Sequence, residues 1–259
     1  MAWDMVHASG REMTTSDEIR RWTEEGLLLS GRSEAEFVPA ESLVLPRGAD
    51  LCRRIEHTIL KPEAGHEEIE RLCSEARKLD VRAVCVAPRN VSLAAGLVHG
   101  TGIRVVAVSG FPLGSTVPKV KGFEAASAAK LGADEIDLVP ALDMLVRGEA
   151  MAVKDEVMEV IAACKRPVKV ILETGLLTPR LMVVGAVAAM AAGASCLKTS
   201  TGFGPRGASI DDVTLLRAVA GPHIAIKASG GIRDRVFAES LVSAGADLLG
   251  TSSAVDILK

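Results

Sequence analysis

The sequence predicts an α/β protein: a (β/α)8 (TIM) barrel at residues 51–259, preceded by an N-terminal extension at residues 1–50. From residue 51 onward, short apolar runs typical of strands alternate with helical patterns, and there are eight such units. Three helical patterns end in the same Gly-Ala joint before the next strand. An open, doubly wound sheet uses the same units and is the alternative. Eight units of near-equal length favour closure.

The expected strands are short and rich in apolar residues: Cys52–Leu60, Ala83–Ala87, Ile103–Ser109, Glu135–Val139, Val168–Glu173, Ser195–Thr199, His223–Ala228 and Asp247–Thr251. Helices are expected between them at His66–Leu79, Asn90–Val98, Pro118–Leu131, Glu149–Cys164, Pro179–Ala192, Ile210–Val219 and Arg233–Ala244. Glycine follows three of these helices, as it does at many helix C-termini: Gly132, Gly193 and Gly245.

The first 50 residues differ in pattern from the rest. Thr15 and Glu18 form a capping-box signature ahead of an amphipathic stretch, which predicts a short helix. Prolines and glycines then interrupt the chain up to residue 48. We expect this extension to pack outside the barrel, with a disordered tail as the alternative.

Composition excludes several classes of partner. The 259 residues carry a formal net charge of −3, dispersed basic residues and few aromatics, which argues against nucleic-acid binding. The most apolar stretch, Leu181–Ala194, is too short to span a bilayer and predicts a buried helix, not a membrane segment. Five cysteines without paired spacing, and no signal-peptide pattern in Met1–Gly10, predict reduced thiols and a cytoplasmic location.

Two lysines in matching positions suggest amine chemistry. Lys198 and Lys227 each end an apolar strand, and each precedes small hydroxyl residues and glycines. A lysine becomes a nucleophile at neutral pH when burial or a neighbouring cation lowers its pKa, and two adjacent barrel strands would supply both conditions. The alternative is that each ammonium simply extends to solvent at the barrel mouth.

One carboxylate is expected to face these lysines. In the run Glu135–Val139, alternation places Glu135 and Asp137 on one face of the strand and Ile136 and Leu138 on the other. Asp137 could then move protons for the lysines. A purely structural ion pair is the alternative.

Glycine- and hydroxyl-rich turns follow the last two strands, where barrels commonly bind phosphate. Gly230-Gly231 follows the seventh strand, and Gly250-Thr-Ser-Ser253 follows the eighth. The Gly202–Gly207 segment matches G-x-G-x-x-G, but its position after a late strand argues against a dinucleotide site and favours a loop of exposed backbone N–H groups beside Lys198. The five histidines form no metal-binding motif, and His57 is interpreted as a structural hydrogen-bonding residue, so neither a metal nor another cofactor is expected.

Taken together, the motifs resemble those of the deoxyribose-phosphate aldolase family from about Leu51 to Ile257. The segments that carry the resemblance are Gly110–Gly114, Ala133–Val139, Ile171–Thr174, Lys198–Phe203 and Lys227–Arg233. The resemblance implies a class I aldolase, a carbon–carbon lyase that reversibly cleaves 2-deoxy-D-ribose 5-phosphate into D-glyceraldehyde 3-phosphate and acetaldehyde. It implies a role in deoxyribose phosphate catabolism and no metal.

Residue roles follow from the same resemblance. Lys198 is implied to form the Schiff base, Lys227 to lower the pKa of that amine and Asp137 to relay protons. The phosphate-binding positions implied by the motifs are Thr201, Gly202, Gly230, Gly231, Ser252 and Ser253. The chain departs from the usual family pattern in carrying Glu56 in place of Asp and in having no tyrosine.

Two other functions remain open from the residues alone. One is a different phosphosugar enzyme on the same barrel, such as another Schiff-base aldolase or an isomerase. The other is a regulatory protein that binds a sugar phosphate without turnover. A homodimer or homotetramer is expected.

Overall fold

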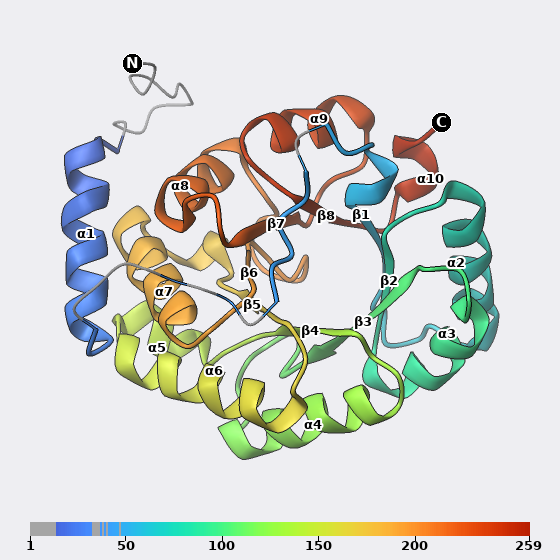
Figure 1. Cartoon of the computed structure of the whole chain (residues 1–259), viewed down its shortest axis with the longest axis horizontal. Helices are drawn as coiled ribbons and strands as arrows, with labels where there is room; N and C mark the ends of the chain where they lie inside the picture. Colours follow the sequence, from blue (N-terminus) through green and yellow to red (C-terminus); the bar gives the residue numbers. More distant parts are fainter. Residues whose placement is uncertain (1–13, 33–36, 38, 40, 47) are drawn as a thin grey trace.

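The computed structural model describes residues 14–32, 37, 39, 41–46 and 48–259, so the expectation drawn from residues 1–10 lies outside the described part. Eight parallel strands form a closed barrel in chain order, with β8 pairing with β1 (Figure 1). They are β1 (Ile55–Ile59), β2 (Ala83–Val86), β3 (Arg104–Ser109), β4 (Glu135–Leu138), β5 (Val168–Ile171), β6 (Cys196–Lys198), β7 (Ala225–Ser229) and β8 (Leu248–Thr251). The predicted barrel is confirmed, and the open sheet is excluded.

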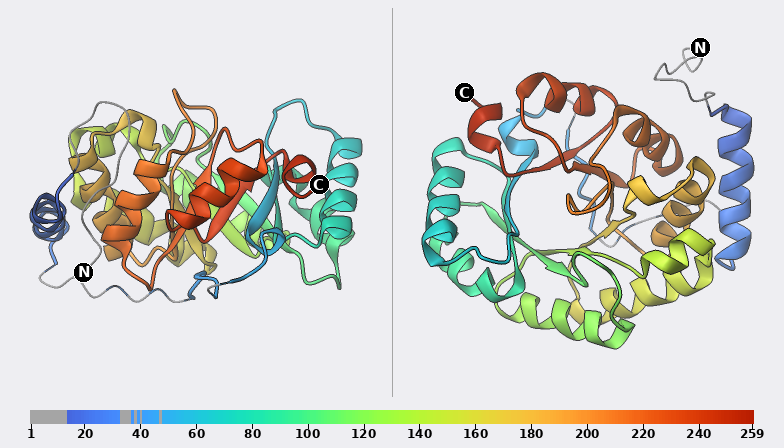
Figure 2. Two further views of the ribbon diagram at one scale, coloured as in Figure 1. Left: turned by 90° about the horizontal axis from the view of Figure 1, so that it is seen from above. Right: turned by 180° about the vertical axis from the view of Figure 1, so that it is seen from behind.

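Helices surround the barrel on its outside, as Figure 2 shows from two further directions. They are α2 (His66–Leu79), α3 (Val91–Val98), α4 (Pro118–Lys130), α5 (Leu142–Arg147), α6 (Ala150–Cys164), α7 (Pro179–Ala191), α8 (Ile210–Ala220), α9 (Arg235–Ser243) and α10 (Ala254–Ile257). At the three Gly-Ala joints, the glycine adopts a positive φ of 112°, 94° or 116°, the conformation that ends a helix and that glycine adopts most easily. The predicted glycine caps are therefore confirmed.

Several element boundaries differ from the sequence expectation. The first strand begins at Ile55 because residues Cys52–Arg54 form a 3-10 turn. The short helices α5 and α10 were not expected, since six and four residues are too few to show a helical period. The fifth strand ends at Ile171, and Glu173 beyond it has a left-handed backbone with φ of 52°.

The extension places a helix against the outer face of the barrel. Helix α1 (Ser16–Leu29) has the predicted capping box at Thr15 and Glu18, and it lies beside α7 in both views of Figure 2. A Cβ at Gly26 would lie 2.9 Å from Val187 Cβ, so the two helices approach closely there. This contact explains why α7 is apolar on all sides: the barrel covers one face and α1 another. The predicted buried helix is confirmed.

Residues 42–46 continue across the end of the barrel where the strands begin. Leu43 is buried against Cys196, Ala225 and Leu248, which lie on β6, β7 and β8. The two ends of the barrel therefore differ: one is covered by the chain itself, and the other, at the carboxyl ends of the strands, opens into a cavity. Within the described residues, no helix is long and apolar enough to cross a bilayer.

Candidate active site

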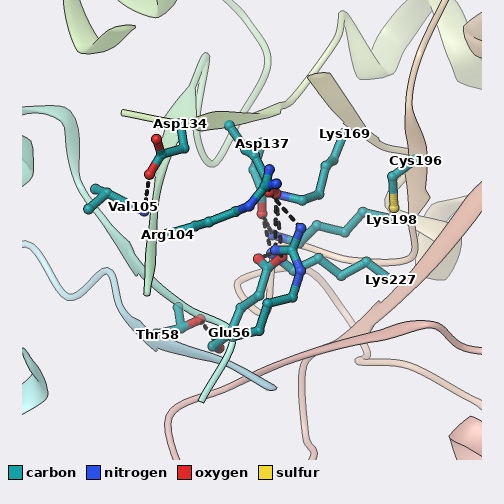
Figure 3. A network of polar contacts seen from close by, with 12 residues as sticks. Glu56, Thr58, Arg104, Val105, Asp134, Asp137, Lys169, Cys196, Lys198 and Lys227 are labelled. Carbon is teal, nitrogen blue, oxygen red and sulfur yellow. Dashed lines mark hydrogen bonds and ion pairs between the residues drawn. The ribbon is translucent and has the colours of Figure 1, made fainter. Parts of the chain in front are cut away.

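The structure brings the three predicted catalytic residues into direct contact. The register of β6 and β7 sets Lys198 opposite Lys227. Both Nζ atoms donate to the same oxygen, Asp137 Oδ2, at 2.7 Å each. Figure 3 shows both lysines extending toward Asp137 inside the barrel. The alternation predicted for β4 is also observed, because Ile136 and Leu138 pack in the outer apolar layer while Asp137 faces inward.

A third lysine belongs to the same cluster. Lys169 on β5 is fully buried, and its Nζ lies 3.0 Å from Asp137 Oδ1 and 2.7 Å from Glu135 Oε2. Glu56 on β1 adds a third carboxylate, which pairs closely with Lys227 and lies 3.4 Å from Lys169. Three lysines and three carboxylates therefore share the interior of the barrel, where many barrels hold only apolar side chains.

These contacts fix the charge of most members of the cluster. Burial alone would raise the pKa of Asp137, but the ammonium groups of Lys169, Lys198 and Lys227 outweigh it and hold this pKa well below its usual range. Burial likewise opposes the charge of Lys227, but Asp137 and Glu56 prevail and raise its pKa. In the free protein, these contacts keep Asp137 ionised and Lys227 protonated.

A cavity of ≈ 700 Å³ opens above this cluster, and Lys198 lines it. Asp137 and Lys227 do not line the cavity; they lie beneath Lys198. Among the residues predicted to bind phosphate, those that line the cavity are Thr201, Gly202, Gly230, Gly231 and Ser252. Ser253 does not, and its backbone N–H donates to Thr251 Oγ1 at 2.9 Å.

Two small packing features hold the floor and wall of the cavity in place. A Cβ at Gly250 would lie 3.0 Å from Lys227 Cε, so the absence of a side chain there gives the lysine room to reach Asp137. Glu173 accepts hydrogen bonds from both the N–H and the hydroxyl of Thr201, which fixes the loop that follows β6. The Thr201 hydroxyl is thus already engaged with a carboxylate.

His57 and its partner Glu75 both line the cavity, so the structural role expected for His57 stays a prediction. His57 Nε2 lies 2.8 Å from Glu75 Oε2, which joins β1 to α2. Among the residues that the structure describes, no three His, Cys, Asp or Glu side chains gather in a way that could hold a metal ion.

Both the sequence and the fold of this chain are similar to those of known proteins. No family profile matches the chain. The deoxyribose-phosphate aldolase of Streptococcus gordonii is 44% identical over 210 residues, which cover 81% of this chain and 96% of the relative. The deoxyribose-phosphate aldolase of Thermoanaerobacter sp. is 42% identical over 214 residues, which cover 81% of this chain and 96% of the relative. This chain belongs to the deoxyribose-phosphate aldolase family.

Solved structures of deoxyribose-phosphate aldolases agree with this assignment. A structure from Coccidioides immitis superposes with a TM-score of 0.80 at 36% identity, covering 91% of this chain and 96% of the other. The aldolase of Aeropyrum pernix, described as a unique tetramer, superposes with a TM-score of 0.76 at 34% identity, covering 92% and 96%.

Several residues in and around this site were not identified from the sequence. Lys169 stands between two valines in Val168–Val170, so it is a charged residue in an apolar strand, the same signal that identified Lys198. Arg82 precedes β2, and only its contacts with Glu56 and Glu135 in the folded chain show that it belongs to the cluster. The basic residues Lys61, Arg71 and Arg233 line the cavity, and no motif marks them as such.

The charged interior predicts an acid-sensitive fold. Burial alone would raise the pKa of Glu135, but Lys169 and Arg82 lower it to about 2, against 4.5 for an unperturbed glutamate. A depressed pKa stabilises the folded state above the unfolded pKa, and this contribution is lost as the pH falls from about 4.5 to about 2, each pKa unit being worth about 1.4 kcal/mol. We expect Glu135→Gln to lower the free energy of unfolding at pH 6. The difference in unfolding free energy between this variant and the unmodified protein should narrow toward pH 2.

Urea unfolding at a series of pH values measures this gap. Glu70→Gln, on the exposed face of α2, is the matched control and should change the unfolding free energy by no more than about 0.5 kcal/mol. A Glu135→Gln gap that is independent of pH, or that widens in acid, would contradict the prediction.

Proposed function

We propose that this protein cleaves 2-deoxy-D-ribose 5-phosphate reversibly into D-glyceraldehyde 3-phosphate and acetaldehyde through a Schiff base on Lys198. The observation that carries the proposal is the contact of Lys198 Nζ and Lys227 Nζ with one oxygen of Asp137. Of these three residues, only Lys198 lines the cavity above them. The names of the family members support the same substrate.

The reaction begins with attack of the neutral Lys198 amine on C1 of the open-chain sugar. The resulting carbinolamine loses water and becomes an iminium ion. This cation can accept the electron pair of the carbon–carbon bond that breaks. Because acetaldehyde has two carbons, the bond that breaks is C2–C3. A base removes the proton of the C3 hydroxyl as this bond breaks, which yields the three-carbon aldehyde and leaves an enamine on Lys198. Protonation at C2 and hydrolysis then release acetaldehyde and restore the amine.

The cluster beneath Lys198 supplies these proton transfers. Ionised Asp137 accepts protons, and protonated Lys227 returns them to the site. Each proton can move between the two because Lys227 Nζ lies 2.7 Å from Asp137 Oδ2. We propose that ordered water connects this pair to the substrate.

The phosphate end of the substrate is held by the rim of the cavity in this proposal. The backbone around Gly202, Gly230, Gly231 and Ser252 offers N–H groups, and Arg233 adds positive charge. Binding energy from the phosphate keeps the short sugar in register with Lys198. The reaction needs neither a metal nor an organic cofactor, because the iminium ion serves as the electron sink.

A covalent adduct tests the proposal. Borohydride added with 2-deoxyribose 5-phosphate should reduce the imine and fix the substrate to Lys198, detected by mass spectrometry of the digested protein. Lys198→Met should abolish both the adduct and turnover, whereas Lys61→Met, which removes another lysine of the cavity wall, should leave the adduct in place. A chelator should leave turnover unchanged. An adduct that persists in Lys198→Met, or turnover that stops with chelator, would refute the mechanism.

We also propose that the chain forms a homodimer or homotetramer in the cytoplasm. The tetramer reported for the Aeropyrum pernix relative supports assembly, and five free cysteines suit a reducing compartment. Large apolar side chains gather around a surface hollow of ≈ 560 Å³ beside α4, where Leu113 is 71% exposed and Phe123 is 76% exposed. Such a patch on a protein surface is typical of an interface.

The oligomer proposal predicts a mass above that of the 27.1 kDa chain in light scattering after gel filtration. Phe123→Glu should lower that mass because it places a charge in the apolar contact. Val236→Glu introduces the same change at a site on α9 that is 75% exposed, and should not alter the mass. A monomeric unmodified protein, or an unchanged mass in Phe123→Glu, would count against this interface.

A further inference from the structure

Arg82 lies at the opposite end of the charged cluster from Lys198. Its side chain is only 10% exposed, and its guanidinium donates to Glu56 Oε1 at 2.8 Å and to Glu135 Oε1 at 2.5 Å. Glu56 also binds Lys227, and Glu135 also binds Lys169. Arg82 therefore competes with two of the three lysines for the carboxylates on which they depend.

A count of buried charges shows the consequence. Three buried lysines, Lys169, Lys198 and Lys227, together with Arg82, whose side chain is 10% exposed, face three buried carboxylates, Glu56, Glu135 and Asp137. An uncompensated charge in a buried site is costly, and an arginine does not give up its proton in proteins. The balanced state of the cluster is therefore the one in which a lysine has lost a proton.

The contacts indicate which lysine this is. Lys169 lies within reach of all three carboxylates, and Lys227 contacts two of them. Lys198 contacts only Asp137, through an oxygen that it shares with Lys227, and it borders the cavity from which a proton can leave. Lys198 is the cation with the least compensation.

We propose that Arg82 is a positioning residue for this chemistry: its positive charge makes the fourth cation of the cluster and so displaces the proton from Lys198. The proposal rests on the proposed aldolase function, because that function uses the neutral Lys198 amine to form the Schiff base. Arg82 does not touch the cavity and acts only through Glu56 and Glu135.

Other buried ionisable groups of the described residues make their contacts outside this cluster: Glu173 accepts from Thr201, Arg54 donates to backbone carbonyls, and Lys121 pairs with Glu156. Cys85 and Cys196 face the interior, and burial raises the pKa of both thiols, that of Cys85 to about 11, so both are neutral. Arg104 on β3 also contacts Glu135, but it is 42% exposed and pairs with Glu41, so water screens its charge. Asp247, at the start of β8, pairs with Arg217 of α8 and is compensated there.

Removal of the Arg82 charge is the direct test. In Arg82→Gln, three lysines face three carboxylates, so all three keep their protons at neutral pH. The acid limb of the kcat/KM profile for 2-deoxyribose 5-phosphate should then move to higher pH, and each unit of movement lowers kcat/KM at neutral pH about tenfold. Activity should return at alkaline pH. Arg82→Lys keeps the charge and should keep the profile of the unmodified protein.

A double variant keeps the test valid if Arg82→Gln folds poorly. Arg82→Gln/Glu135→Gln removes one positive and one negative charge, leaving three cations and two carboxylates, which restores the excess of one cation. The acid limb of the kcat/KM profile of this double variant should lie at nearly the same pH as that of the unmodified protein. Arg53→Gln, at the same end of the barrel but paired only with Asp80, is the matched control and should leave the profile unchanged.

Two results would overturn the proposal. One is an acid limb in Arg82→Gln at the same pH as in the unmodified protein; the other is an equal shift in Arg82→Lys, which would show that charge is not the cause. Both require an unmodified protein that turns over and is trapped by borohydride. A lack of turnover and trapping in the unmodified protein would instead refute the proposed function itself, so the two failures can be told apart.

Discussion

The site depends on the sharing of one buried oxygen, Asp137 Oδ2, by the side-chain nitrogens of two lysines, Lys198 and Lys227. Three lysines could not be buried in a barrel without carboxylates to compensate them, because the desolvation of each charge is costly. Glu56 on β1 and Glu135 and Asp137 on β4 provide that compensation, and β4 pairs directly with the Lys169 strand, β5. Figure 3 shows Glu56 and Asp137 beside the lysines. The same pairs that hold the interior together thus set the charge of the reactive amine.

Much of the fold could be predicted from the sequence because each unit repeats the same local signals. The Gly-Ala joints and the alternation of apolar strands with helical patterns agree with one another, and local agreement of this kind identifies the eight units. Helices α5 and α10 could not be predicted, since they are too short to show a period. The apolar character of α7 was correctly read as burial, but only the position of α1 explains it.

The candidate site was predictable in part. Lys198 and Lys227 stand out because a lysine at the end of an apolar strand is unusual, and alternation alone directed Asp137 inward. The charge balance could not be predicted, because Glu56 on β1, Arg82 just before β2 and Glu135 on β4 meet only after the barrel closes. A sequence shows which residues are charged, whereas the count of cations and carboxylates requires knowing which of them are buried together.

The most direct test of this description is to observe the protons of the buried lysines themselves. Carbon NMR of protein labelled at lysine Cε should show one buried lysine that loses its proton at lower pH in the unmodified protein than in Arg82→Gln, and this signal should be missing in Lys198→Met. The signals of Lys169 and Lys227 should stay in their protonated positions well into alkaline pH, because carboxylates raise the pKa of both. If Lys198 keeps its proton to the same alkaline pH as Lys169 and Lys227, or if the titrating signal survives in Lys198→Met, the charge balance of the cluster is wrong.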